Sequence, residues 1–346
     1  MQTAQAGRGG RPTLKTIAYI TGLGVTTVSR ALNDAPDIGR ATKERVRLVA
    51  AQIGYRPNRA GVRLRTGKTN VISLVLSVEN EIFGLTSHVV YGISEYLATT
   101  PYHLIVTPYR LGADPLDPVR YIVETGSADG IVFSRTERED PRVRYLHERG
   151  FPFATHGRTE MGIAHPYFDF DNGRYAEIAV ERLAARGRRR LALLPPPANL
   201  TYAGHITDGF QRAIDRHDLI DVPVRGVTTD SGYEAIRAEV GRMMATRRRP
   251  DGFVCASAAA AIAVIGGAED SGCAIGRDFD IAVKESFDIM RKFRPQIEVV
   301  REDFRAAGMG LADAVVRTIA GVPAEDLQTI QVPDGPQPKG RPTDAD

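Results

Sequence analysis

An alternation of strand-length apolar runs with helix-period stretches begins at Val71, and this pattern most constrains the fold of the chain. Buried strands are expected at 71–78, 104–107, 130–134, 151–155, 190–194, 252–256 and 281–283. Amphipathic helices are expected between them, for instance at 84–98, 172–186, 232–245 and 305–319. The alternation indicates an α/β fold with parallel sheets, and about 260 residues of it are enough for two lobes.

The first 70 residues carry most of the positive charge. They hold thirteen Lys and Arg residues against three acidic residues, a net charge of +10, whereas residues 71–346 hold 32 against 39, a net charge of −7. A basic head on a mildly acidic body suggests that the head contacts a polyanion. Charge alone would also fit a solvated basic tail, but the helical pattern of this segment favours a folded unit.

Three short helices are expected in the basic head. Thr13 is the predicted N-cap of a helix at 14–21, and a turn with two glycines follows at 22–24. A second helix then begins at Val25, and a third is expected at 41–53. Helix, short glycine-containing turn and helix form the pattern of a helix-turn-helix unit, so an all-α head is predicted.

The second of these helices has two different faces. Its apolar stripe consists of Val28, Ala31 and Leu32. The opposite face consists of Thr26, Ser29, Arg30 and Asn33, with Thr27 at its edge. This face has one cation and no carboxylate, and its short hydrogen-bonding side chains suit base edges and phosphate oxygens. We therefore interpret this segment as a DNA recognition helix.

A basic segment follows the third helix. Pro57 prevents that helix from continuing, and Asn58 could cap a further short helix. In such a helix Ala60 and Leu64 would share one face, and Arg59 and Arg63 would share another. The leucine could then wedge into a minor-groove base step while the arginines hold phosphates. A basic linker with an incidental leucine is the alternative.

Three motifs of the head together resemble the lactose-repressor (LacI/GalR) family. They are Thr13-Leu14-Lys15-x-Ile17-Ala18, Val25-x-x-Val28-Ser29-Arg30-Ala31-Leu32-Asn33 and Gly54-Tyr55-Arg56-Pro57-Asn58. The resemblance covers residues 12–70. It implies a dimeric repressor that places its second helix in the major groove and inserts a hinge-helix leucine at the operator centre.

The resemblance also implies roles for single residues of the head. Base reading falls on Val25, Thr26 and Arg30, and the wedge on Leu64. Phosphate contact falls on Thr13, Thr27, Ser29 and Asn33. Asn58, Arg59 and Arg63 complete the predicted DNA-binding set.

For the body, the resemblance implies two lobes like those of a periplasmic sugar-binding protein, with three chain crossings and an effector in the cleft. Candidate effector-binding residues follow or lie near the predicted strand ends: Glu79, Phe83, Arg135, His156, Arg158, Asp169, Tyr202, His205, Lys284 and Glu285. Aromatic faces with charged partners suit a sugar, although an ordinary loop salt bridge is an equal alternative for each residue singly. Ile206 stands where many family members have an effector-clamping Arg, which leaves the ligand class open.

The expected organisation has four parts. Residues 12–57 form the helix-turn-helix domain, 58–69 the hinge helix and linker, 70–332 the two-lobed effector-binding and dimerisation domain, and 333–346 a disordered tail. The two cysteines lack metal-ligand spacing, and no run is long and apolar enough for a membrane span. A polar start without a signal-peptide pattern predicts a cytoplasmic protein without membrane partners.

The sequence therefore predicts a DNA-binding transcriptional regulator. We expect a repressor of carbohydrate-related genes that binds a palindromic operator as a homodimer and responds to a small ligand, a sugar. A regulator that senses a non-sugar molecule, an activator, and a solute-binding protein for transport are the alternatives. No dinucleotide-binding, phosphate-loop or nucleophile motif occurs, so neither enzymatic activity nor a cofactor or metal is expected.

Overall fold

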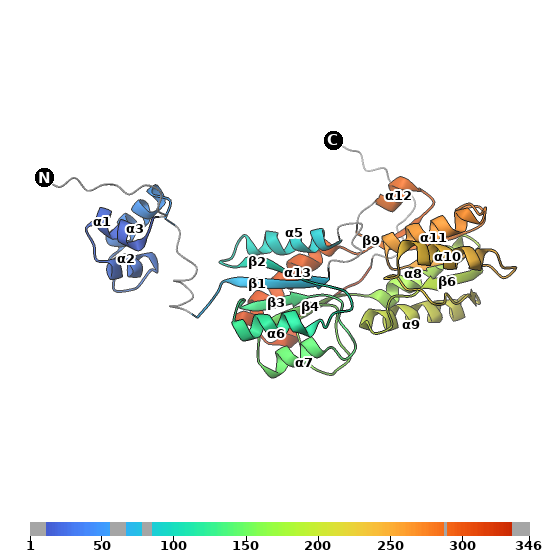
Figure 1. Cartoon of the computed structure of the whole chain (residues 1–346), viewed down its shortest axis with the longest axis horizontal. Coiled ribbons are helices and arrows are strands. Elements are labelled where there is room, and N and C mark those ends of the chain that lie inside the picture. Colours follow the sequence, from blue (N-terminus) through green and yellow to red (C-terminus); the bar gives the residue numbers. More distant parts are fainter. Residues whose placement is uncertain (1–11, 56–66, 78–84, 287–288, 334–346) are drawn as a thin grey trace. The chain divides into compact units, whose positions relative to one another are not determined.

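The computed structural model describes residues 12–55, 67–77, 85–286 and 289–333 (Figure 1). The chain divides into two compact units, Met1–Thr69 and Asn70–Asp346, which are described separately. Most of the predicted hinge and the tail from residue 334 onward lie outside the described residues.

The head consists of α1 (Leu14–Thr21), α2 (Val25–Leu32) and α3 (Arg40–Gln52). Thr13 caps α1 as predicted: its side chain accepts a hydrogen bond from the Thr16 amide, and the Thr16 hydroxyl accepts one from the Thr13 amide. Gly22 ends α1 with a φ of 69°, a left-handed conformation that favours glycine and turns the chain into α2. A small core holds the three helices together, with Ile17, Val28, Ala31 and Val46 completely buried.

The second unit consists of two lobes. Lobe 1 is a six-stranded parallel sheet with its covering helices. Its strand order is β11-β5-β4-β3-β1-β2. The strands are β1 (Val71–Ser77), β2 (His103–Tyr109), β3 (Gly130–Phe133), β4 (Phe153–His156), β5 (Tyr167–Phe170) and β11 (Gln328–Gln331). The helices are α5 (Leu85–Leu97), α6 (Leu116–Thr125), α7 (Pro141–Glu148), α13 (Phe304–Ile319) and the 3₁₀ turn η1 (Ala324–Leu327).

Alternate residues of β1 explain how lobe 1 is layered. Ile72 and Leu74 pack with residues of α5 and α13 on one face. Val71 and Val75 pack with residues of α6 and α7 on the other face (Figure 1). Both faces of the strand are apolar because both are covered by helices, as the continuous apolar run predicts.

Lobe 2 is a five-stranded parallel sheet with the order β10-β9-β8-β6-β7. Its strands are β6 (Arg190–Leu194), β7 (Ile220–Asp221), β8 (Gly252–Cys255), β9 (Asp280–Glu285) and β10 (Glu298–Arg301). Its helices are α8 (Asn172–Ala185), α9 (Thr201–Arg216), α10 (Tyr233–Met244), α11 (Ala258–Asp270) and α12 (Ile289–Phe293). Helices α8 and α9 share one apolar core with the sheet, and α10 and α11 share a second. No helix in the described part of the chain could cross a membrane.

The chain crosses from lobe 1 to lobe 2 between β5 and α8, and back between β10 and α13. The third crossing that the resemblance implies does not occur before Pro333, where the described residues end. The fold is the predicted one, a helical head and two parallel α/β lobes.

Four short strands were not predicted, namely β5, β7, β10 and β11. Asp169, which was expected soon after the fourth predicted strand, lies on one of these strands, β5. Its side chain interrupts the short apolar run Tyr-Phe-Asp-Phe, so the strand has no clear hydrophobic signal. The predicted strand at 151–155 begins two residues later, at Phe153, after Pro152.

Helices α5 and α13 approach each other through two glycines. A Cβ atom built on Gly308 would overlap the carbonyl oxygen of Val89, and one built on Gly92 would overlap that of Arg305. Because the overlap is with backbone, the two helices would have to separate to admit a methyl group.

We therefore expect Gly308→Ala to lower the free energy of unfolding by about 1–3 kcal/mol, as overpacking does. The control is Gly241→Ala on α10, where the nearest atom to a built Cβ is 3.7 Å away. This control should leave stability unchanged or raise it by up to about 1 kcal/mol through helix propensity. Urea unfolding of the full chain measures both, and equal midpoints for Gly308→Ala and wild type would contradict the close packing.

Candidate functional site

Helix α2 exposes one face of the head. Val25 is 41% exposed and Thr26 is exposed, whereas Val28 and Ala31 on the opposite side are completely buried. Arg30 keeps 54% of its side-chain surface exposed, and its Nη2 atom lies 2.6 Å from Oδ1 of Asp37. The structure thus places the three predicted base-reading residues on the outer side of α2.

The predicted phosphate-contacting residues have additional local roles. Thr13 is the N-cap of α1, and the Asn33 side-chain amide donates to the carbonyl of Ser29 at 2.6 Å at the end of α2. Thr27 and Ser29 are half-buried at the edge of the exposed face. Four further predicted DNA-binding residues lie outside the described residues: Asn58, Arg59, Arg63 and Leu64.

Every carboxylate of the head has a cationic partner. Asp37 pairs with Arg30, Glu44 pairs with Arg40 at 2.9 Å, and Asp34 pairs with Lys43 at 3.1 Å and with Arg47 at 2.9 Å. The hydrogen bond and charge of Lys43, together with the charge of Arg47, lower the pKa of Asp34 below its ordinary value. The head therefore keeps a large excess of positive charge at neutral pH.

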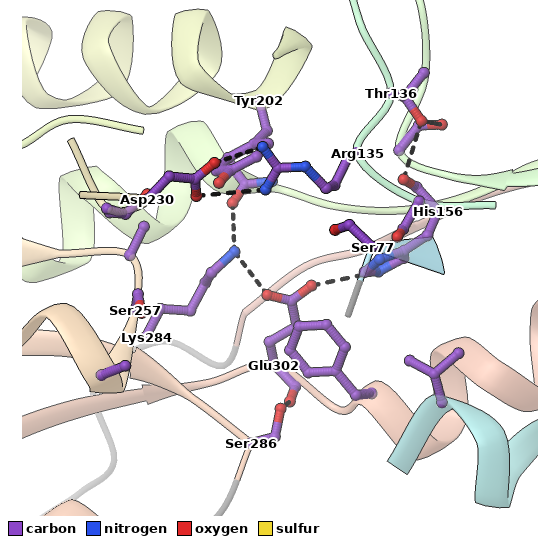
Figure 2. Close-up of a pocket in the computed structure, with 18 of the residues that line it drawn as sticks. Ser77, Arg135, Thr136, His156, Tyr202, Asp230, Ser257, Lys284, Ser286 and Glu302 are labelled. Atoms are coloured by element: carbon purple, nitrogen blue, oxygen red, sulfur yellow. Dashed lines mark hydrogen bonds and ion pairs between the residues drawn. The ribbon is translucent and has the colours of Figure 1, made fainter. Parts of the chain in front are cut away.

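Lobes 1 and 2 enclose a cavity of about 340 Å³ beyond the carboxyl ends of their strands (Figure 2). This volume is at the lower end of the roughly 300–1,000 Å³ of small-ligand pockets. Eight of the predicted effector-binding residues line it: Arg135, His156, Arg158, Asp169, Tyr202, His205, Lys284 and Glu285. The other two, Glu79 and Phe83, lie outside the described residues.

Glu302 connects the two lobes at the floor of the cleft. It follows β10 at the crossing to α13, and its Oε2 atom lies 2.7 Å from Nζ of Lys284 on β9. Its Oε1 atom lies 3.5 Å from Nε2 of His156 on β4 (Figure 2). Burial raises the pKa of Glu302, but the charges of Lys284 and His156 outweigh burial and lower it to about 2.

The ammonium group of Lys284 has further partners. It donates to Oδ1 of Asn172 at 2.8 Å, and it lies 5.1 Å and 5.4 Å from the ring centroids of Phe170 and Tyr202. Aromatic faces stabilise a desolvated cation, so the buried charge is compensated on several sides.

Arg135 and Asp230 form a second connection between the lobes. The Arg135 Nη2 atom lies 2.5 Å from Oδ2 of Asp230, and Nη1 donates to Oδ1 at 3.4 Å (Figure 2). Arg135 has a left-handed φ of 57°, which is uncommon for a non-glycine residue. The completely buried pair of Asp140 and Arg142 supports this turn, because Nη2 of Arg142 donates to the Arg135 carbonyl at 2.9 Å.

Arg158, Asp169 and His205 form a third cluster. Nη1 of Arg158 lies 3.3 Å from Oδ2 of Asp169. Burial raises the pKa of Asp169 against the opposing charge of Arg158. Burial, and then the charge of Arg158, lower the pKa of His205, so this imidazole is neutral at pH 7.

Sequence reasoning missed two residues that organise the cleft, Glu302 and Asp230. Glu302 follows the four-residue strand β10, which was itself not predicted, and an acid at the carboxyl end of a strand was its available signal. Asp230 lies in the loop before α10, and its pairing with Arg135, 95 residues away, has no local signal. Ile206, which stands where the resemblance implies an effector-clamping Arg in many members, is completely buried in the core of lobe 2.

Glu302→Gln tests the buried charge cluster. The shift from 4.5 to about 2 corresponds to stabilisation on the order of 3 kcal/mol, present in full above pH 4.5 and lost as the pH falls toward 2. We expect urea unfolding to show a constant deficit of the variant between pH 7 and 5 that shrinks below about pH 4.5. Glu298→Gln, which removes a more exposed partner of Arg186, should cost less than about 1 kcal/mol. A pH-independent deficit for Glu302→Gln would contradict the assignment.

Comparison with known proteins supports the two-part organisation. Residues 13–58 match the pattern of bacterial regulatory proteins of the lacI family, and residues 180–339 match a periplasmic binding protein-like domain. The HTH-type transcriptional regulator RafR of Escherichia coli is 37% identical over 228 residues, which are 64% of this chain and 67% of RafR.

Two solved structures share the fold. The lac repressor dimer bound to operator and the anti-inducer ONPF is 18% identical, with 94% of this chain and 97% of that chain covered and a TM-score of 0.79. The transcriptional regulator CelR–cellobiose complex is 23% identical, with coverages of 94% and 98% and a TM-score of 0.65. On its sequence patterns and its similarity to RafR, the chain belongs to the LacI family of DNA-binding transcriptional regulators.

Proposed function

We propose that this protein is a transcriptional repressor that binds a palindromic operator as a homodimer and responds to a sugar in the cleft between lobes 1 and 2. The main support is the face of α2, where Val25, Thr26 and Arg30 lie on the outside of a head with excess positive charge. Side chains of this kind read base edges in the major groove, and the surrounding cations neutralise phosphates.

The proposed division of labour follows the chain. Residues 12–57 read the DNA, 58–69 link the head to the body, and 70–332 bind the sugar and form the dimer. The contacts across the cleft support control by a ligand, because Arg135–Asp230 and Lys284–Glu302–His156 join residues of both lobes. A ligand that touches both lobes stabilises one lobe arrangement, and it changes operator affinity by its differential affinity for the two states.

A sugar is the ligand that the lining fits best. Tyr202, Tyr233 and Phe304 offer aromatic surface beside charged hydrogen-bonding groups, a combination that suits the apolar faces and hydroxyls of a sugar ring. The CelR–cellobiose complex, which has the same fold, contains a disaccharide. We propose a role in the control of carbohydrate-related genes on this basis.

Binding of the full chain to a palindromic duplex with a central CG step tests the repressor proposal. A dimer that neutralises many phosphates should lose affinity steeply with salt, with a log–log slope of about −0.9 per phosphate contacted. Fluorescence anisotropy measures this slope. A flat salt response, or equal affinity for a scrambled duplex, would contradict the proposal.

Arg30→Ala tests the reading face of α2. Loss of a base-contacting arginine should weaken binding to the palindromic duplex by about 1–3 kcal/mol and reduce discrimination against scrambled DNA. Arg47→Ala on α3 is the matched control, because Arg47 is also a half-exposed arginine paired with an aspartate of the head. The control should weaken both duplexes equally and by a few-fold at most. If the two substitutions changed binding to both duplexes equally, Arg30 would not be a base-reading residue.

A further inference from the structure

Each Lys and Arg that lines the described part of the cleft is already paired with a carboxylate. Arg135 pairs with Asp230 at 2.5 Å, and Lys284 pairs with Glu302 at 2.7 Å. Arg158 lies 3.3 Å from Asp169. All six side chains are at least two-thirds buried, so solvent screens these pairs weakly.

The carboxyl groups of the described lining at least balance its cations. Glu285, which is 3% exposed, adds a fourth carboxyl group to the lining, and the imidazole of His205 is neutral because burial lowers its pKa. His156 faces Glu302.

Helix N-termini also meet the cleft, and these could favour an anion. Two of them are already capped by side chains of this chain. Ser257 accepts a hydrogen bond from the Ala260 amide at the start of α11, and Asp171 accepts one from the Arg174 amide at the start of α8. Asp230 lies three residues before α10, which places its own negative charge near that N-terminus.

Arg135 and its counter-ion Asp230 are each held in place by neighbouring residues. The Arg135 backbone is held in its left-handed conformation by the donation from Arg142, whose side chain is 1% exposed and bound to Asp140. Asp230 itself is held by its loop, where the Asp230 amide donates to the Thr228 hydroxyl at 3.3 Å. An anionic ligand that approached the guanidinium group would also meet the negative charge of this carboxylate.

We propose that the cleft takes an uncharged polyhydroxylated ligand, a neutral sugar or glycoside, and that Asp230 determines this specificity by neutralising Arg135. This inference rests on the proposed function of the cleft as a sugar site. A hydroxyl group both donates and accepts, so it can use the remaining N–H groups of Arg135 and lone pairs of Asp230 without breaking the pair. The charged oxygens of a phosphate or carboxylate accept, and their negative charge would face the carboxylate of Asp230.

Thermal shift and calorimetry on the full chain test the proposal. The neutral probes are glucose, cellobiose, maltose, melibiose and raffinose, and the anionic probes are inorganic phosphate, glucose 6-phosphate and glucuronate. At least one neutral probe should raise the Tm of the wild type, and no anionic probe should do so.

Asp230→Asn should reverse the discrimination, because it leaves Arg135 without a counter-ion. We expect this variant to gain binding of inorganic phosphate or glucose 6-phosphate and to bind the neutral sugar about tenfold more weakly, which corresponds to about 1.4 kcal/mol. Asp270→Asn is the matched control, since it frees Arg237 on the exposed side of lobe 2. This control should behave like the wild type with every probe.

Two results would overturn the proposal. One is an anionic probe that binds the wild type as tightly as its neutral parent sugar, and the other is a folded Asp230→Asn variant that gains no anion binding. The phosphate measurement on the variant decides even when the panel lacks the natural sugar. If Asp230→Asn does not fold, anion binding by Asp230→Ser and the probe panel on the wild type test the proposal instead.

Operator binding separates this inference from the proposed function. A neutral sugar that binds the wild type but leaves operator affinity unchanged supports the inference and contradicts ligand control of DNA binding. A sugar phosphate that binds the wild type and changes operator affinity overturns the inference and leaves ligand control intact.

Discussion

The buried carboxylate of Glu302 is the interaction on which the cleft depends. It lies where the chain returns from lobe 2 to lobe 1, and it contacts Lys284 of lobe 2 and His156 of lobe 1. With a pKa of about 2, this carboxylate stays ionised through the physiological range. A charge buried at a chain crossing must keep its partners, because a lone buried charge is strongly destabilising. The geometry of the two strand ends is therefore fixed by electrostatics as well as by packing.

Two ion pairs are linked through Arg135. One is its own pair with Asp230, and the other is the pair of Asp140 and Arg142. Asp140 and Arg142 lie within lobe 1 and hold the turn from which Arg135 reaches across to Asp230. The pair of Asp140 and Arg142 is completely buried and local in sequence, so it shapes one loop. The pair of Arg135 and Asp230 is partly exposed and joins the lobes, so a ligand bound beside it and the arrangement of the lobes could affect each other.

The sequence predicts those parts of the structure that depend on residues close together in the chain, and it misses those that depend on residues far apart. The head helices and longer strands were predictable because their signals are local: caps such as Thr13, the glycine turn at Gly22, and apolar runs such as Val71–Ser77. The short strands β5 and β10 lack such runs. Pairings such as Arg135–Asp230 or His156–Glu302 link residues 95 and 146 positions apart, and only the completed sheets bring them together.

The same pairing of arginine with aspartate has different consequences in the head and in the cleft. Arg30 and Asp37 are both about half-exposed, so water and salt screen the pair, and a phosphate can replace the aspartate at small cost. The head also has ten more cations than acids, and neutralising a polyanion relieves that repulsion. Arg135 and Asp230 are about three-quarters buried, and acids in the surrounding lining balance its cations. Burial and the local charge balance thus differ between the head and the cleft in the way that a DNA polyanion and the proposed uncharged ligand require.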